Sequence, residues 1–204
     1  MFQPLISGPA SNFPGKETWL DFNTLFNLNM SELSASGDTN TDADGIRAAI
    51  HQNAELVESR IILCIIMQES SGNVGVQTTG DDDAGLMQAH GSPGFPGQHG
   101  LSQVRFRTCV IQPIYGALLT MLTYAQDQIT SMVTAGTMHF KGNLEELGNG
   151  DDAATIYSAL RLYNSGKLNA NDLSDGEGAT PSYVSDIAYR LQGRVDGDFQ
   201  RTEL

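Results

Sequence analysis

The stretch IILCIIM, residues 61–67, constrains the fold most, because it is apolar on every side of the helix that it would form. A helix without a polar face must be covered by other elements, so this one is predicted to be the buried centre of the molecule. Ser59 is a candidate N-cap, and the helix is predicted to run from about Arg60 to Ser70.

Glu69 lies at the end of this apolar run, and its position predicts an unusual carboxyl group. Its neighbours one and two turns back are all isoleucines, so partial desolvation is expected: Ile66, Ile65 and Ile62. Burial and the negative end of the helix dipole both disfavour ionisation and predict a raised pKa. A carboxyl group that keeps its proton suits general-acid catalysis. The alternative is a helix end that only faces water.

The remaining pattern predicts a mainly α fold, with an N-terminal surface arm over residues 1–16 and one domain over residues 17–204. Residues 72–103 are rich in Gly, Asp, Ser and Pro, which leaves room for a short hairpin at most. The other helices are expected at 19–33, at 42–57, at about 113–134 with Gly136 closing it, from a cap at Asp151 or Asp152 to Gly166, and from Thr180-Pro181 to Gly193.

Charge and composition exclude several classes of function. The net charge of −13 argues against nucleic acid and against an anionic membrane surface. No apolar run reaches the roughly 18 residues of a membrane span. The N-terminus lacks the basic start and apolar centre of a signal peptide, so the protein is either cytosolic or a secreted protein whose signal has been removed, and we expect the second. No cofactor is implied. The His and Cys spacings fit no structural zinc site, so no metal is expected.

Cys64 and Cys109 are too few for a disulfide scaffold. They are expected either to form one bridge, which secretion favours, or to remain as two buried thiols.

Residues 80–85, GDDDAG, offer a second carboxylate. Three adjacent aspartates repel one another and belong in a solvated turn, which is the plain structural interpretation. The spacing does not fit a calcium-binding EF-hand loop, because Ser92 stands where that loop needs a glutamate. The functional interpretation is that one Asp faces Glu69 across a cleft and activates a water molecule.

Two later segments also have ordinary interpretations when each is taken alone. In the first, Gly85-Leu86-Met87-Gln88, the methionine is typical of a core position. In the second, Tyr163-Asn164 precedes Ser165-Gly166, where a packed tyrosine and a helix C-cap are common.

Taken in order, Glu69-Ser70 and these two segments resemble the goose-type lysozyme and soluble lytic transglycosylase family, which cleaves the glycan strands of peptidoglycan and sometimes chitin. The resemblance covers about residues 57–170. It implies a lysozyme-like single domain with a buried central helix followed by an irregular or β-hairpin region. The acidic, Gly- and Asn-rich chain with its segment SPGFPGQHGLSQ is similar to secreted fungal relatives of that fold.

The resemblance implies that Glu69 is the catalytic acid, and that five residues line the sugar cleft: Ser70, Met87, Gln88, Tyr163 and Asn164. Goose-type members carry a water-activating Asp before the Gly-Leu-Met-Gln segment. Asp81 follows a glycine as it does there, but the shorter spacing leaves Asp82 and Asp83 as rivals. His90 stands where those lysozymes carry a further Asp, and it is included with the substrate-binding residues.

The expected activity is therefore hydrolysis of β-1,4 bonds in peptidoglycan, the polysaccharide that the family mostly uses, by a monomeric muramidase with inversion at the anomeric carbon. Inversion places the two carboxyl groups roughly 6.5–9.5 Å apart. The alternatives are a lytic transglycosylase, a chitinase with the same acid, and a glycan-binding relative that has lost catalysis. Chitin is neutral, whereas acidic peptidoglycan and the negative charge of this chain repel each other near neutral pH.

Overall fold

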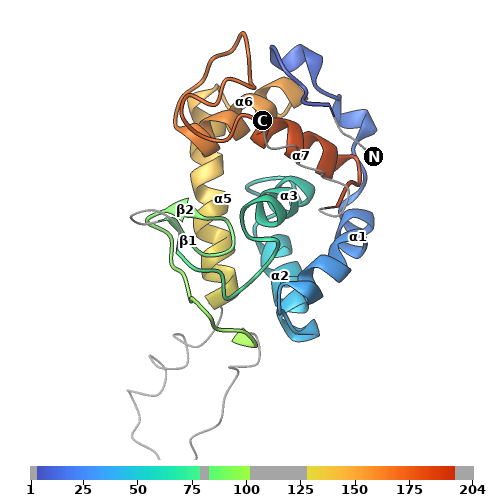
Figure 1. Ribbon diagram of the computed structural model, residues 1–204, viewed down its shortest axis with the longest axis vertical. Helices are drawn as coiled ribbons and strands as arrows, with labels where there is room; N and C mark the ends of the chain where they lie inside the picture. The colour runs from blue at the N-terminus through green and yellow to red at the C-terminus, as the bar shows by residue number, and fades with distance from the viewer. Residues whose placement is uncertain (1–3, 79–82, 102–127, 196–204) are drawn as a thin grey trace, which may run out of the picture.

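The structure is a computed structural model, which describes residues 4–78, 83–101 and 128–195 (Figure 1). This part of the chain is mainly α-helical with one small sheet, which confirms the prediction of a mainly α fold. The helices are α1 Phe22–Ala35, α2 Asn40–Gln52, α3 Ser59–Ser70, α5 Gln128–Glu146, α6 Ala153–Ser165 and α7 Tyr183–Leu191, with short 3-10 turns at Ala10–Asn12 and Lys16–Thr18. The strands are β1 Asp83–Ala84 and β2 Ala89–His90.

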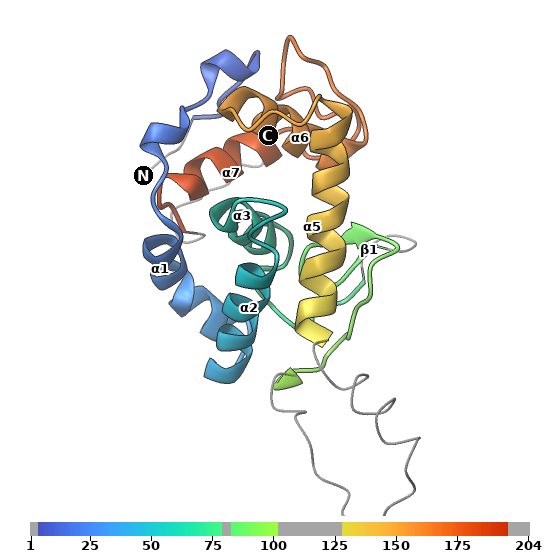
Figure 2. The same ribbon diagram turned by 180° about the vertical axis from the view of Figure 1, so that it is seen from behind.

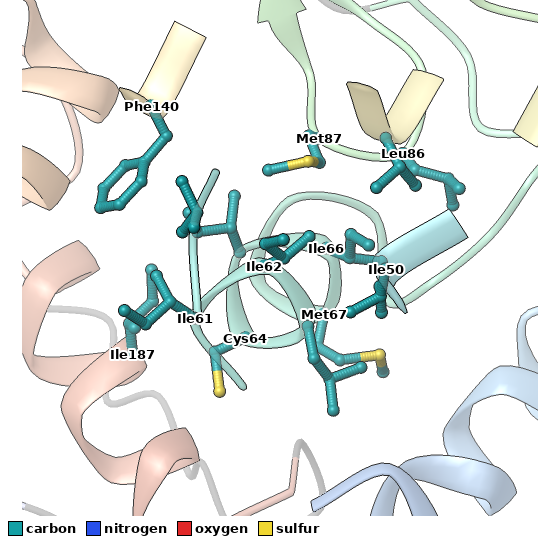
Figure 3. Close-up of a cluster of buried hydrophobic side chains, with 14 of the residues drawn as sticks. Ile50, Ile61, Ile62, Cys64, Ile66, Met67, Leu86, Met87, Phe140 and Ile187 are labelled. Atoms are coloured by element: carbon teal, nitrogen blue, oxygen red, sulfur yellow. The ribbon is translucent and has the colours of Figure 1, made fainter. Parts of the chain in front are cut away.

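Helix α3 lies at the centre and contacts α1, α2, α5 and α7 (Figures 1 and 2). Every residue from 61 to 67 is at most 2% exposed. Apolar side chains surround the helix, with Ile187 of α7 on one side and Leu86 and Met87 on another (Figure 3). The prediction of a buried central helix is confirmed. Its start was wrong by one residue, because Ser59 is already helical and Glu58 precedes it without a side-chain cap.

Most other helix ends follow the predicted caps with small shifts. Asp152 caps α6 by accepting from Thr155 N, and Gly166 ends it in the left-handed conformation at φ 67°. Helix α2 starts before Asp42, because Thr39 forms a capping box with that residue. The predicted end of this helix at residue 57 was wrong, because α2 ends at Gln52.

The predicted N-terminal segment of 19–33 and the predicted start of the last helix both need correction. Trp19 precedes α1 and lies in the core, where its indole N–H donates to Tyr157 Oη at 3.0 Å. Helix α7 begins at Tyr183, after the predicted Thr180-Pro181 start.

The prediction that Gly136 closes a helix was wrong. Residues 113–127 of that predicted helix lie outside the described residues, and α5 continues through Gly136 to Glu146. Gly136 is a packing residue: a Cβ atom there would lie 2.4 Å from Met87 Cβ. The missing side chain lets α5 approach the turn between the two strands.

Replacing Gly136 by Ala is therefore expected to lower the free energy of unfolding by about 1–3 kcal/mol, because the added methyl group overpacks the contact with Met87. Gly142→Ala is the matched control in the same helix, since a Cβ there meets no atom within 4 Å. Relieving the helix of that exposed glycine is expected to add up to about 1 kcal/mol. Urea denaturation of both variants checks the opposite signs, and equal effects would contradict the packing role.

The segment after α3 forms the hairpin that the sequence allowed. Strands β1 and β2 pair antiparallel, with Asp83 opposite His90. Ser70 Oγ lies 2.8 Å from Leu86 O, and this hydrogen bond ties the end of α3 to the hairpin turn. The segment is also attached at residue 100, whose N–H donates to Asp42 Oδ2 at 2.8 Å. These bonds hold the hairpin beside α5, where both views place it (Figures 1 and 2).

Cys64 is a buried free thiol, so the structure does not show the predicted bridge to Cys109, which lies outside the described residues. Burial raises the pKa of this thiol to about 12. Within the described ranges, no helix is long and apolar enough to cross a membrane.

Candidate functional site

A pocket of about 400 Å³ lies where the end of α3, the hairpin, α5 and the end of α6 meet. Its walls carry both acidic and basic groups together with amides and an aromatic ring. The lining residues are Glu69, Asp83, Gln88, Ala89, His90, His139, Leu162, Tyr163, Asn164 and Gly166.

Glu69 enters this pocket from the last turn of α3, which ends where Ser71 adopts the left-handed conformation at φ 53°. Burial raises the pKa of Glu69 to about 7, and the negative charge of Asp83 acts in the same direction. The Tyr183 hydroxyl donates to Glu69 Oε1 at 2.6 Å and opposes this rise, because it stabilises the carboxylate. The sequence-based prediction of a raised pKa is confirmed, with burial as the main cause.

Asp83 is the described carboxylate that shares the pocket with Glu69. The strand register places it opposite His90, whose Nδ1 lies 3.3 Å from Asp83 Oδ1. Asp81 and Asp82, the other candidates for the second carboxylate, lie outside the described residues. The pocket therefore holds a carboxyl group with a raised pKa and a second carboxylate next to an imidazole.

Tyr163 and Asn164 line the pocket from the last turn of α6. The Tyr163 hydroxyl donates to Met87 O at 2.7 Å, and burial holds its pKa well above the ordinary value. Asn164 Oδ1 accepts a hydrogen bond from Arg161 Nη2. Gln88 lies at the hairpin turn with φ 43°, and its amide Nε2 donates to Gly85 O at 2.8 Å.

Ser70 and Met87 do not line the pocket, contrary to what the resemblance implied. Ser70 is buried and bonds to Leu86 O, while Met87 is 1% exposed and packs in the core. Both hold the turn that carries Gln88. The structure thus brings together six of the residues singled out in the sequence: Glu69, Asp83, Gln88, His90, Tyr163 and Asn164.

Two residues of the site were missed at the level of sequence. His139 of α5 lies edge-on to the Tyr163 ring, 5.0 Å between centroids. Its pKa is lowered by partial burial and by the nearby His90. Tyr183 reaches Glu69 from α7. Neither stands in a motif, and only the fold places them here.

The residues that the structure describes contain no group of three or more His, Cys, Asp or Glu side chains arranged to hold a metal ion. Comparisons with protein-family models, with curated proteins and with solved structures gave no match. The site's own geometry is therefore the basis for its interpretation.

Replacing Tyr183 by Phe is expected to raise the pKa of Glu69 further above about 7, because the carboxylate loses its hydrogen-bond donor. NMR titration of ¹³C-labelled glutamate carboxyl groups measures this change directly. Tyr189→Phe is the control on the same helix, since the Tyr189 hydroxyl donates to Pro4 O. An unchanged Glu69 titration in Tyr183→Phe would show that the hydroxyl does not influence the carboxyl group.

Proposed function

We propose that the protein is a glycoside hydrolase of the muramidase type, with a lysozyme-like fold, that cleaves β-1,4 bonds in peptidoglycan. The observation that carries the proposal is the shared pocket of Glu69 and Asp83, with one carboxyl group partly buried and bonded to Tyr183 and the other beside His90. Two carboxyl groups in distinct environments are what acid and base roles in glycoside hydrolysis require.

In this proposal Glu69 is the general acid. The Tyr183 hydroxyl occupies Oε1, so the proton of the neutral carboxyl group is carried by Oε2. With a pKa of about 7, Glu69 keeps this proton at acidic pH and in about half of the molecules at neutral pH. It transfers the proton to the glycosidic oxygen as the sugar approaches an oxocarbenium-like state.

Asp83 is the base, in place of Asp81 and Asp82, because it lines the pocket and its charge acts on Glu69. It accepts a proton from a water molecule that attacks the anomeric carbon from the face opposite the leaving group, and the configuration inverts. The His90 imidazole lies beside this carboxylate, with 3.3 Å between His90 Nδ1 and Asp83 Oδ1.

The proposal is tested by incubating the protein with bacterial cell walls and, in parallel, with chitin oligomers, followed by mass spectrometry of the products. Hydrolysis of the cell walls with new reducing ends is the expected result. Products lighter by one water would identify a lytic transglycosylase, and cleavage of chitin alone would identify a chitinase. Binding without any cleavage would contradict the hydrolase and leave a glycan-binding protein.

A further inference from the structure

Arg161 of α6 is an unusual core residue, since its side chain is fully buried. Among residues 4–78, 83–101 and 128–195, no carboxylate forms an ion pair with it. Its guanidinium instead donates to neutral oxygens: Nη1 to Leu173 O and Thr180 O, each at 3.2 Å, and Nη2 to Asn164 Oδ1. A buried cation is costly unless it is well bonded, so these contacts fix its position.

The contact with Arg161 determines which way the Asn164 amide points. A guanidinium has only donors, so only the amide oxygen can face it, and the NH₂ group must face the other way. Asn164 lines the pocket. Within the described residues, no protein acceptor takes a hydrogen bond from its Nδ2. Among the neighbouring donors, the Tyr163 hydroxyl bonds to Met87 O, and one of the two N–H groups of the Gln88 amide bonds to Gly85 O.

We propose that Arg161 is a positioning residue that holds Asn164 as an N–H donor toward the pocket, where it selects a ligand carbonyl. In a glycan the group that offers such an acceptor is the acetamido group of an N-acetylated sugar. The inference rests on the proposed glycan-binding function of the pocket and adds a specificity to it. A hydroxyl group in the same place is a weaker partner, because it also needs an acceptor of its own.

The test compares the binding of chitotetraose, which carries acetamido groups, with that of cellotetraose, which is neutral and carries hydroxyl groups there. Calorimetry is done in the Glu69→Gln background so that neither probe is consumed. The decisive variant is Asn164→Asp. Its carboxylate keeps the side-chain volume and pairs with Arg161, but it presents an oxygen where the N–H stood. Chitotetraose affinity is expected to fall at least about tenfold, with cellotetraose affinity little changed and thermal stability retained.

Asn27→Asp is the matched control, because Asn27 Oδ1 also accepts from an arginine, Arg47 Nη2 at 3.3 Å, on the exposed side of α1. It makes the same change in net charge and is expected to leave both affinities unaltered. Arg161→Met adds a second measurement. It frees the Asn164 amide to rotate and is expected to reduce the preference for chitotetraose, although it also removes the donor to Leu173 O and Thr180 O.

A wild-type preference for chitotetraose that survives in Asn164→Asp would overturn the inference, and so would the absence of any preference. These outcomes are separate from the fate of the proposed function, because they are read from binding and not from turnover. A protein that binds chitotetraose through Asn164 but cleaves no glycan would refute the hydrolase and keep the inference. Glycan cleavage together with chitotetraose binding that does not depend on Asn164 would keep the hydrolase and refute the inference.

Discussion

Replacing Glu69 by Gln is expected to abolish glycan cleavage, with turnover reduced about 10²–10⁴-fold or more, while the fold is retained. Glutamine fills the same volume, and its amide oxygen still accepts from the Tyr183 hydroxyl, but it has no acidic proton for the leaving group. Release of reducing ends from cell walls measures the loss. Near-normal turnover in this variant would refute the assignment of the acid.

The same variant has a stability signature that does not depend on substrate. The pKa of Glu69 rises from its ordinary 4.5 to about 7, so the folded protein binds this proton more tightly than the unfolded chain does. Its contribution to stability is therefore fully present at low pH and is lost as the pH rises from 4.5 to about 7. The melting temperature of Glu69→Gln minus that of the wild type is accordingly expected to be higher at pH 8 than at pH 4, because only the wild type loses stability when Glu69 ionises. A difference that is independent of pH would contradict the titration.

Replacing Asp83 by Asn is expected to have the second largest effect, a loss of turnover of about 10²–10⁴-fold, because the attacking water loses its base. The asparagine keeps the volume of the side chain and its place opposite His90. Substrate affinity should therefore change far less than the turnover rate. Measuring both in the variant and in the wild type checks this difference.

Three further variants separate the role of Asp83 as the base from a general effect of the acidic loop and from an effect through His90. Asp81→Asn and Asp82→Asn are expected to cause mild losses. His90→Gln tests whether the effect of Asp83 operates through its imidazole neighbour at 3.3 Å. Mild losses in all three Asp variants would remove the base and favour the transglycosylase reaction, in which a hydroxyl group of the substrate replaces water.

Features set by local sequence could be predicted well. The central helix followed from an apolar run with no polar face, and burial of residues 61–67 is nearly complete. The cap at Asp152 and the left-handed Gly166 depend on backbone groups within a few residues. The raised pKa of Glu69 followed from its isoleucine neighbours, because burial is its largest cause.

Features that depend on partners distant in the chain were not predictable from the same patterns. Gly136 stands where a helix could end, but α5 continues to Glu146, and the close approach of Met87 accounts for the glycine at this position. Ser70 and Met87 belong to the segments that resemble the family's motifs, but both are buried and support the hairpin turn without lining the pocket. The orientation of Asn164 depends on Arg161, which a sequence pattern presents as an ordinary helix residue.

The hydrogen bond between Tyr183 and Glu69 has a consequence for the order in which the molecule becomes functional. The two residues are 114 positions apart in the chain, and the tyrosine belongs to the last helix that the structure describes. During synthesis the ribosome releases the α3 segment long before α7 exists. The Glu69 carboxyl group thus meets its hydroxyl partner only after α7 has been synthesised and has docked, so the environment of this carboxyl group is completed late in folding.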